Sequence, residues 1–492
     1  MSFSVASILA YVLGIVGTAL ILPLAVSLRY GEATCQVAAF AGPLAFSWAA
    51  AAIAFACRRR GRDASLATGS AFILVGCVWV AIGLFGALPL WIGGALPNFI
   101  DAVFESVSGF TTTGASVAQE VESLPRSVNL WRCETHWLGG MGVIALAVAL
   151  MPLLGVGGFR LFKAETTGPE KGKVTSRITD TAKALWLIYF LMTATEAVLL
   201  HAAGLGWYDA VCHSFSTLGT GGFSTRNGSI GAFDSAAVDW ICIAFMFLAS
   251  VNFALYFRLF TGRAGELRKD TELKALARIV IVAVVTVTLV EMRDFGSFAH
   301  SLRYSAFQVA AIISTTGFST DDYAQWRPAA QLILFALFWV GGCSGSTAGG
   351  IKVIRWTVLA KQLRNEFSRL IHPHEVTTLR INGVPGREEF VPLVAAFIFT
   401  YVLLVFATAL ASAFAGLGLV ESLTAALSMV GNIGPAFGEL GPTADYSSLP
   451  AALKVWYSFA MLAGRLEIYT MLILALRGLS LCKPPVAHRV QR

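Results

Sequence analysis

The sequence contains few charged residues for its length. Aspartate, glutamate, lysine and arginine make up 13% of the 492 residues, whereas hydrophobic residues make up 56%. Soluble domains carry about 25% charged residues, so this composition excludes a protein that folds with water as its only solvent. Apolar runs long enough to cross a bilayer occur ten times, at 4–28, 37–57, 69–93, 136–155, 183–205, 237–260, 275–293, 329–360 (interrupted), 390–416 and 454–476. We therefore predict an all-α polytopic membrane protein that contacts the lipid bilayer directly.

Other absences exclude further classes of site. The eight cysteines include no C-x-x-C pair, so neither a zinc site nor a disulfide framework is indicated. His372 and His374 have no cysteine or acid at ligand spacing, and we expect no transition metal. The net charge of +7 comes from basic residues spread over alternate loops, which argues against a nucleic-acid partner. The first segment lacks a basic n-region and is too long for a signal peptide, so we expect a retained span.

The distribution of charge predicts the orientation in the membrane. Basic residues follow the second, fourth, sixth and eighth spans and end the chain, including Arg58, Lys171, Arg268, Lys361 and Arg489. The positive-inside rule places these loops and both termini in the cytoplasm. The opposite loops carry acids, among them Asp101, Glu120, Glu122, Asp234, Asp321, Asp322, Glu439 and Asp445. We expect this acidic outer face to attract cations.

Four short segments between spans on the acidic side resemble one another. They read SGFTTTGAS at 108–116, STLGTGGFS at 216–224, AIISTTGFS at 311–319 and SMVGNIGPA at 428–436. The four align without gaps on Gly114, Gly222, Gly317 and Gly434. Small-residue helix contacts or outer turns are an alternative explanation, but they do not account for four copies in phase. The pattern predicts four covalently linked repeats of helix, pore loop and helix around one pore.

Each repeat is predicted to hold a re-entrant pore helix and a filter loop. Thirteen residues before the aligned glycines stand Asp101, Asp209, Tyr304 and Glu421, so an acid opens three of the four helices. The acid complements the positive end of the helix dipole, while the negative end points to the bilayer centre. Backbone carbonyls of the four loops would then replace the hydration shell of a cation. The predicted filter residues are Thr112, Thr113, Gly114, Thr220, Gly221, Gly222, Thr315, Thr316, Gly317, Asn432, Ile433 and Gly434.

A glycine-rich interruption of the eighth span predicts a gate below the filter. The interruption contains Gly341, Gly342, Gly345, Gly349 and Gly350, and Lys352 follows it. Irregular backbone at membrane depth must line a cavity or be buried in protein, so we expect a flexible gate here. Helix packing by small residues remains an alternative for the glycines. For Lys352, a simple position at the cytoplasmic boundary remains equally open.

Two charged residues in or beside the membrane also call for a role. Arg465 lies inside the last span, and Glu467 is too close in sequence to be an obvious partner on the same helix. We expect Arg465 to act as an electrostatic barrier below the filter or as an anchor for the gate, with an ion pair to a neighbouring helix as the alternative. We expect Glu105 to accept hydrogen bonds behind the filter.

These motifs resemble the TrkH branch of the Trk/Ktr/HKT superfamily of potassium transporters. The resemblance covers nearly the whole chain and rests on SGFTTTGA at 108–115, WLGGMGV at 137–143, GGCSGSTAGG at 341–350 and GRLEI at 464–468. It implies potassium uptake across a bacterial cytoplasmic (inner) membrane, with potassium ion as substrate and no covalently bound cofactor. It also implies a homodimer regulated by a cytoplasmic nucleotide-binding ring of TrkA type.

The chain departs from the pattern of this family at two positions. His136 stands where glutamine is expected, and Ala436 stands where glycine is frequent. Relatives that prefer sodium carry serine at the first filter glycine. Because Gly114 is intact, the resemblance favours potassium.

The predicted organisation divides the chain into an N-terminal helix pair and four repeats. The segments are 1–66 for the pair, then 67–156, 157–262, 263–362 with the interrupted helix, and 363–492 with the cytoplasmic C-terminus. The alternative function is a proton- or sodium-coupled symporter, whose mark would be a midplane acidic site between inverted repeats. A remote second alternative is an intramembrane serine protease, because residues 342–345 match G-x-S-G. Its base would have to come from His136, His201 or His213, none of which has a companion motif, so we expect no enzyme.

Overall fold

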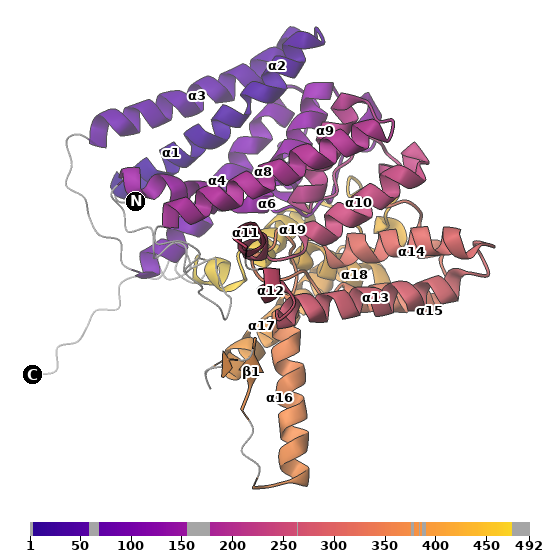
Figure 1. The fold of residues 1–492 in the computed structure, drawn as a ribbon. Coiled ribbons are helices and arrows are strands. Elements are labelled where there is room, and N and C mark those ends of the chain that lie inside the picture. The colour runs from indigo at the N-terminus through magenta and orange to yellow at the C-terminus, as the bar shows by residue number, and fades with distance from the viewer. Residues whose placement is uncertain are drawn as a thin grey trace, which may run out of the picture.

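The computed structural model describes residues 3–58, 68–154, 178–262, 264–374, 378–382, 384–385 and 390–474. The described chain is almost entirely helical (Figure 1). The helices are α1 (Phe3–Ala19), α2 (Ile21–Arg29), α3 (Thr34–Arg58), α4 (Thr68–Ile92), α5 (Phe99–Phe110), α6 (Arg126–Leu154), α8 (Ile178–Ala202), α9 (Trp207–Gly219), α10 (Ala236–Ala249), α11 (Phe253–Phe260), α12 (Ala264–Leu267), α13 (Thr271–Glu291), α14 (Phe298–Ile313), α15 (Pro328–Leu337), α16 (Val353–Ile371), α17 (Phe390–Phe414), α18 (Leu419–Gly431) and α19 (Ala451–Arg465).

One small sheet qualifies the all-α prediction. Strand β1 (Arg380–Ile381) pairs with β2 (Val384–Pro385) in an antiparallel hairpin. The hairpin follows α16, which projects from the body of the molecule in Figure 1. In sequence the hairpin lies in a basic loop that we predicted to be cytoplasmic.

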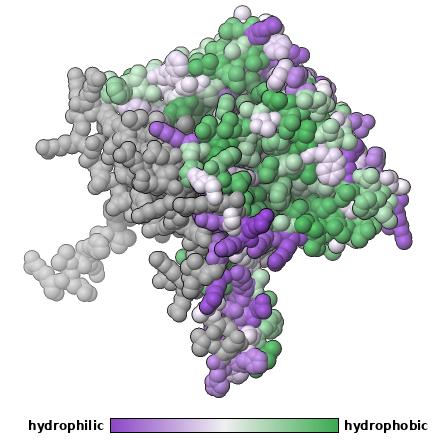
Figure 2. All heavy atoms as spheres, in the orientation of Figure 1, coloured by the Kyte–Doolittle hydropathy of each residue, from purple (hydrophilic) through white to green (hydrophobic). Residues whose placement is uncertain are grey.

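Long apolar helices form the outside of the body. Six helical stretches of the described chain are long and apolar enough to cross a membrane, namely Ala6–Arg29, Thr34–Cys57, Ile73–Ile92, Lys183–Ala202, Thr271–Glu291 and Val391–Phe414. Their outward side chains are exposed and apolar, as with Ile281 on α13 and Phe406 on α17. Figure 2 shows hydrophobic residues over much of the visible face and hydrophilic residues on the projecting α16. An apolar helical surface of this kind can contact the hydrocarbon interior of a lipid bilayer.

The helix that follows each pore loop is broken in all four copies. In α6, Gly142 has non-helical angles of φ 71° and ψ 134°. Helices α10 and α11 meet at a bend of 92°, and residues 338–352 separate α15 from α16. Helix α19 ends at Arg465, after which Glu467 and Ile468 both have positive φ. The sequence predicted only the third of these breaks, and the prediction of continuous fourth, sixth and tenth spans was wrong.

Four short helices, α5, α9, α14 and α18, precede the aligned glycines as predicted. Asp101, Asp209 and Glu421 each lie in the first turn of their helix. The third copy differs, because α14 begins at Phe298 and Tyr304 lies in its middle. The predicted start of this helix at Tyr304 was therefore wrong.

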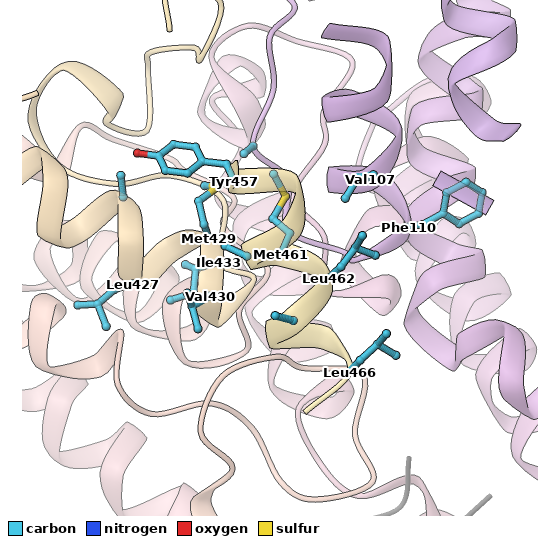
Figure 3. Close-up of a cluster of buried hydrophobic side chains, with 14 of the residues drawn as sticks. Val107, Phe110, Leu427, Met429, Val430, Ile433, Tyr457, Met461, Leu462 and Leu466 are labelled. Atoms are coloured by element: carbon cyan, nitrogen blue, oxygen red, sulfur yellow. The ribbon is translucent and has the colours of Figure 1, made fainter. Parts of the chain in front are cut away.

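The pore helices are packed in the centre of the molecule. Figure 3 shows Leu427, Met429 and Val430 of α18 in one buried cluster with Tyr457, Met461 and Leu462 of α19. Val107 and Phe110 of α5 belong to the same cluster. The helices of the first and fourth copies are thus in contact, although they are far apart in sequence.

Candidate ion pathway

The four loops after the pore helices share one backbone conformation. We call residues 112–114, 220–222, 315–317 and 432–434 the filter loops. The first residue of each is left-handed, with φ of 55° at Thr112, 55° at Thr220, 56° at Thr315 and 55° at Asn432. The last residue is a glycine with φ of 80° at Gly114, 85° at Gly222, 75° at Gly317 and 101° at Gly434. Glycine adopts such angles without steric cost, whereas other L-residues do so rarely.

The same hydrogen bond ends each pore helix. The residue before the glycine donates its N–H to the carbonyl at the start of the aligned segment. These bonds are Thr113 to Ser108 at 2.8 Å, Gly221 to Ser216 at 2.9 Å, Thr316 to Ala311 at 2.9 Å and Ile433 to Ser428 at 3.0 Å. A left-handed residue followed by this bond is the Schellman ending of a helix. The resemblance of the four segments in sequence therefore extends to their hydrogen bonds.

The four filter loops contact one another in a closed order. A methyl group on each glycine would collide with the carbonyl oxygen of the middle residue of the next loop. The distances are 1.9 Å from Gly114 to Gly221, 2.1 Å from Gly222 to Thr316, 2.0 Å from Gly317 to Ile433 and 2.5 Å from Gly434 to Thr113. The fourth loop thus returns to the first. Only glycine fits at these four positions in the described geometry.

A buried ion pair supports the first filter loop. Glu105 of α5 is buried and accepts hydrogen bonds from the Ser116 hydroxyl at 2.9 Å and the Val117 N–H at 2.8 Å. Arg132 of α6, also buried, donates to the same carboxylate at 2.7 Å. The prediction that Glu105 accepts hydrogen bonds is confirmed, whereas a position behind an ion filter stays a prediction.

Different residues support the other three loops, and only His213 and Gln308 stand, like Glu105, nine residues before the aligned glycine. His213 of α9 lies 2.9 Å from the Ser224 hydroxyl, and the Gln308 amide donates to the Asp321 carbonyl at 3.2 Å. In the fourth loop, the hydroxyls of Ser428 and Tyr446 donate to the Gly434 carbonyl at 2.7 and 2.8 Å. Sequence alignment missed these partners because their side chains differ in chemistry from copy to copy.

The glycine-rich interruption lies against the filter loops. We call residues 341–350 the gate loop. The Gly349 N–H donates to the Thr315 hydroxyl at 2.6 Å, and a methyl group on Gly349 would stand 2.4 Å from the Gly431 carbonyl oxygen. Lys352, at the N-cap of α16, donates to the Ala348 carbonyl. The structure therefore brings the predicted gate residues next to the third and fourth filter loops.

Close packing and backbone angle account for the glycines of the gate loop. A methyl group on Gly341 would stand 2.1 Å from the Gly349 carbonyl oxygen, and one on Gly342 would stand 2.7 Å from Ala348 Cβ. Gly345 and Gly350 have φ of 77° and 66°. The loop is thus folded tightly on itself in this conformation.

Arg465 joins the gate loop to α6. Its guanidinium donates to the Thr347 carbonyl at 2.7 Å and to the Gly139 and Gly140 carbonyls at 2.6 and 3.2 Å. Glu467 forms its ion pair with Arg355 of α16. Arg465 thus bonds to the gate loop and to α6, and its role as anchor or barrier stays a prediction.

The gate loop also contacts the break between α10 and α11, which the sequence did not reveal. The Cys343 N–H donates to the Ser250 carbonyl at 2.8 Å, and the Phe253 N–H donates to the Gly345 carbonyl at 3.1 Å. The Thr347 hydroxyl donates to the Ala249 carbonyl at 3.1 Å. Two polar residues, Ser250 and Asn252, inside an apolar run were the only local signal for this break.

Basic residues partly offset the acids of the predicted outer face. Arg226 lies 3.7 Å from Glu122 and 3.8 Å from Asp209. Arg327 is hydrogen-bonded to Asp294, and this contact lowers the pKa of the Asp294 carboxyl. The described residues contain no group of three or more histidine, cysteine or acidic side chains placed to hold a metal ion.

Comparisons with known proteins identify the family. A family model described as a cation transport protein, TrkH, matches residues 37–479. The Trk system potassium uptake protein TrkH of Halomonas elongata is 40% identical over 92% of this chain and 94% of its own length. The protein of that name in Escherichia coli K12 is 37% identical over 84% of this chain and 86% of its own length.

A solved structure extends the likeness to three dimensions. The crystal structure of the potassium transporter TrkH from Vibrio parahaemolyticus has a TM-score of 0.83 at 32% identity, covering 96% of this chain and 98% of that one. Its fold is that of an all-helical, multi-span membrane protein. The chain therefore belongs to the TrkH family of cation transport proteins, a family of transporters and not of enzymes.

Proposed function

We propose that this chain takes up potassium through a pore on the axis of the four filter loops. The closed order of contacts among these loops is the observation that carries the proposal. Four equal backbone segments around one axis present rings of carbonyl oxygens that can replace the water around a cation. Relatives named for potassium uptake indicate which cation.

The proposed ion contacts are the carbonyls of Thr112, Thr113, Gly114, Thr220, Gly221, Gly222, Thr315, Thr316, Gly317, Asn432 and Ile433. Gly434 holds its loop in shape, and its carbonyl already accepts two hydroxyl groups. The pore is built from four repeats, 67–156, 157–262, 263–362 and 363–492, with 1–66 as an added helix pair. The shared φ angles and the broken helix in every copy support this division.

We propose that the gate loop and Arg465 form the barrier below the filter. The loop contacts a filter residue through the hydrogen bond from Gly349 to Thr315. Arg465 places a positive charge beside the loop, where it repels a cation strongly if water is scarce. Lys352, bound to the Ala348 carbonyl, holds the end of the loop in place.

The proposed setting is a bacterial cytoplasmic membrane, with the basic loops and both termini in the cytoplasm. The chain acts as a homodimer with one pore per subunit, and a nucleotide-binding ring of TrkA type regulates it. The positive-inside rule supports the orientation, and the family supports the partners. The basic residues at 59–62, 160–177 and 483–492, and the two ends of the chain, lie outside the described residues.

Growth of a bacterial strain without its own potassium uptake systems tests the proposed function. Expression of this chain with a TrkA-type partner should restore growth at low external potassium. A variant without residues 345–349 keeps the filter loops intact and should still support growth. No rescue by well-expressed, membrane-inserted protein would contradict potassium uptake.

A second candidate is proton-coupled symport, which Glu134 and Glu196 favour. Both carboxylates are buried, Glu134 on α6 in the first copy and Glu196 on α8 in the second. Their replacement by glutamine, combined with a measurement of proton entry during potassium uptake, separates the two functions. Passive permeation predicts that potassium flux follows the potassium gradient alone in both variants.

A further inference from the structure

A buried carboxylate at the start of α13 joins the gate loop to the helix that follows it. Glu272 is 8% exposed and lies in the first turn of the helix. Its Oε1 atom accepts hydrogen bonds from the Ser344 N–H at 2.7 Å and the Ile354 N–H at 3.0 Å. Ser344 belongs to the gate loop, and Ile354 lies in the first turn of the helix that follows it. One oxygen therefore joins the loop to α16.

Glu272 also supplies a cap that α16 lacks in its own sequence. The first N–H groups of a helix have no partner within the helix and need an outside acceptor. Lys352, the N-cap residue of α16, makes no capping hydrogen bond with its side chain. A carboxylate at this place is favoured by the helix dipole as well as by the hydrogen bond. Glu272 thus binds the N-terminus of α16 to the N-terminus of α13.

The same turn of α13 holds the β-hairpin. The Thr271 N–H donates to the Asn382 side-chain oxygen at 2.7 Å, and the Asn382 N–H donates to the Thr271 hydroxyl at 3.2 Å. The Asn382 amide also lies 3.4 Å from Asp270. The hairpin also contacts α16, because the Lys361 ammonium group donates a hydrogen bond to the Arg380 carbonyl at 2.6 Å.

We infer that Glu272 is a positioning residue that holds the gate loop against the filter loops. We further infer that the first turn of α13 transmits movement of the β-hairpin to the gate loop. Asp270 and Thr271 hold the hairpin, and the adjacent Glu272 holds the gate loop. A displacement of the hairpin therefore shifts the turn of α13 that positions the gate loop. This inference rests on the proposed function of the gate loop, because it concerns how that gate is held.

The test compares Glu272→Ala with Glu272→Gln in potassium flux into liposomes that contain the purified chain alone. Alanine removes the acceptor, whereas glutamine keeps an oxygen at the same place. We expect Glu272→Ala to raise flux about tenfold, since two hydrogen bonds to a charged group are lost, and Glu272→Gln to stay near the parent. A gain of flux is a readout that loss of a merely structural residue does not produce. Equal flux in the two variants would overturn the inference.

Two further variants control for charge and for the hairpin. Glu266 of α12 is a half-exposed acid close in sequence that pairs with Arg258 at 3.4 Å, so Glu266→Ala removes an acid without touching the gate loop. It should leave flux unchanged, and a rise equal to that of Glu272→Ala would contradict the inference. Asn382→Ala should raise flux by itself and add little to Glu272→Ala, because both act through one turn. If the double variant raised flux by the full sum of the two single effects, the two residues would act independently, which would exclude transmission through α13.

Failure of the inference can be told apart from failure of the proposed gate. Deletion of residues 345–349 and Arg465→Ala enter the same assay. If these two variants raise flux and Glu272→Ala does not, the gate stands and the role of Glu272 is wrong. If none of the three raises flux while all are monodisperse in detergent, the gate itself is elsewhere, and the inference falls with it.

Discussion

At the scale of single residues, the filter glycines are required by shape. Gly114 has φ of 80°, and a methyl group there would stand 1.9 Å from the Gly221 carbonyl oxygen. A side chain at this position must displace the backbone of the neighbouring loop. Because the loops touch in a closed order, such a displacement reaches the carbonyl oxygens that we propose bind the ion.

We predict that Gly114→Ser lowers the preference for potassium over sodium before it affects folding. A shift of carbonyl oxygens by a few tenths of an ångström alters the fit to one cation more than the packing of distant helices. A tenfold fall in the permeability ratio corresponds to about 1.4 kcal/mol at 25 °C. The ratio is measured from reversal potentials with potassium and sodium on opposite sides of the membrane.

Gly94 offers a matched control for this substitution. It also has a positive φ, of 74°, but a methyl group there would meet nothing within 4 Å. Gly94→Ser therefore introduces the same kind of backbone strain away from the filter loops. The permeability ratio should stay at the parent value, and an unchanged ratio in Gly114→Ser as well would remove Gly114 from the filter.

The buried pair of Glu105 and Arg132 gives a prediction for stability. Removal of one partner leaves an uncompensated buried charge, which costs about 3–5 kcal/mol. We therefore expect Glu105→Ala to lower the thermal unfolding temperature of the purified protein clearly, and Glu105→Gln to lower it less, because two of the three hydrogen bonds remain possible. Glu366→Ala, which breaks an exposed pair with Arg369, should leave that temperature unchanged. A Glu105→Ala protein as stable as the parent would show that this pair does not hold the first filter loop.

At the scale of elements, the sequence predicted the four pore helices and filter loops but only one of the four broken helices. The filter loops could be found because glycine and threonine recur at fixed places within apolar surroundings. The breaks in α6, between α10 and α11 and after α19 change few residues in runs that remain apolar enough to cross a bilayer. Apolar length alone does not distinguish a straight span from a broken one.

The alignment of the four segments also failed to predict the length of the third pore helix. Counting back from the aligned glycine assumes pore helices of equal length, but α14 extends to Phe298. The supporting residues Arg132, His213 and Tyr446 were missed for a related reason. Each lies far from its partner in sequence or differs from its counterparts in chemistry, so only the folded chain identifies it.

The gate loop yields a prediction at this scale. Deletion of several residues between 345 and 349, or Arg465→Ala, should raise potassium flux through the chain without its partner and leave ion selectivity largely unchanged. The deletion removes backbone that packs against Gly431, and the substitution removes the hydrogen bond to Thr347. Flux into liposomes is compared with that of the parent at equal protein density. If both variants fold and neither exceeds the parent, Arg465 is a structural anchor only.

At the scale of the whole molecule, the prediction of orientation remains to be measured. Cysteine labelling from each side, in a background without native cysteines, should place Arg226 and Asp322 outside and Lys171 and Arg268 inside. The acidic and basic loops alternate along the chain, and a translocated basic loop is disfavoured. Lys171 lies outside the described residues, so labelling is the direct test at that position. Labelling of Lys171→Cys from the outside would overturn the predicted number of spans.

Composition and repeated motifs predicted the membrane class, the family and the four aligned loops, because each of these predictions depends on many residues at once. The partners and the coupling of transport depend on surfaces and energies that a single chain does not reveal. The β-hairpin illustrates this, since its strands carried no signal in sequence, yet Asn382 in its turn bonds to α13 and Arg380 bonds to α16.

Ion flux into liposomes that contain the purified chain alone tests the central claim most directly. Potassium, rubidium, sodium and lithium are compared at equal gradients, in the parent and in Gly114→Ser. A filter of backbone carbonyls predicts that potassium and rubidium pass in preference to sodium and lithium in the parent, and that the preference falls in the variant. Equal flux of all four ions in the parent, or a preference that Gly114→Ser leaves intact, would contradict the account.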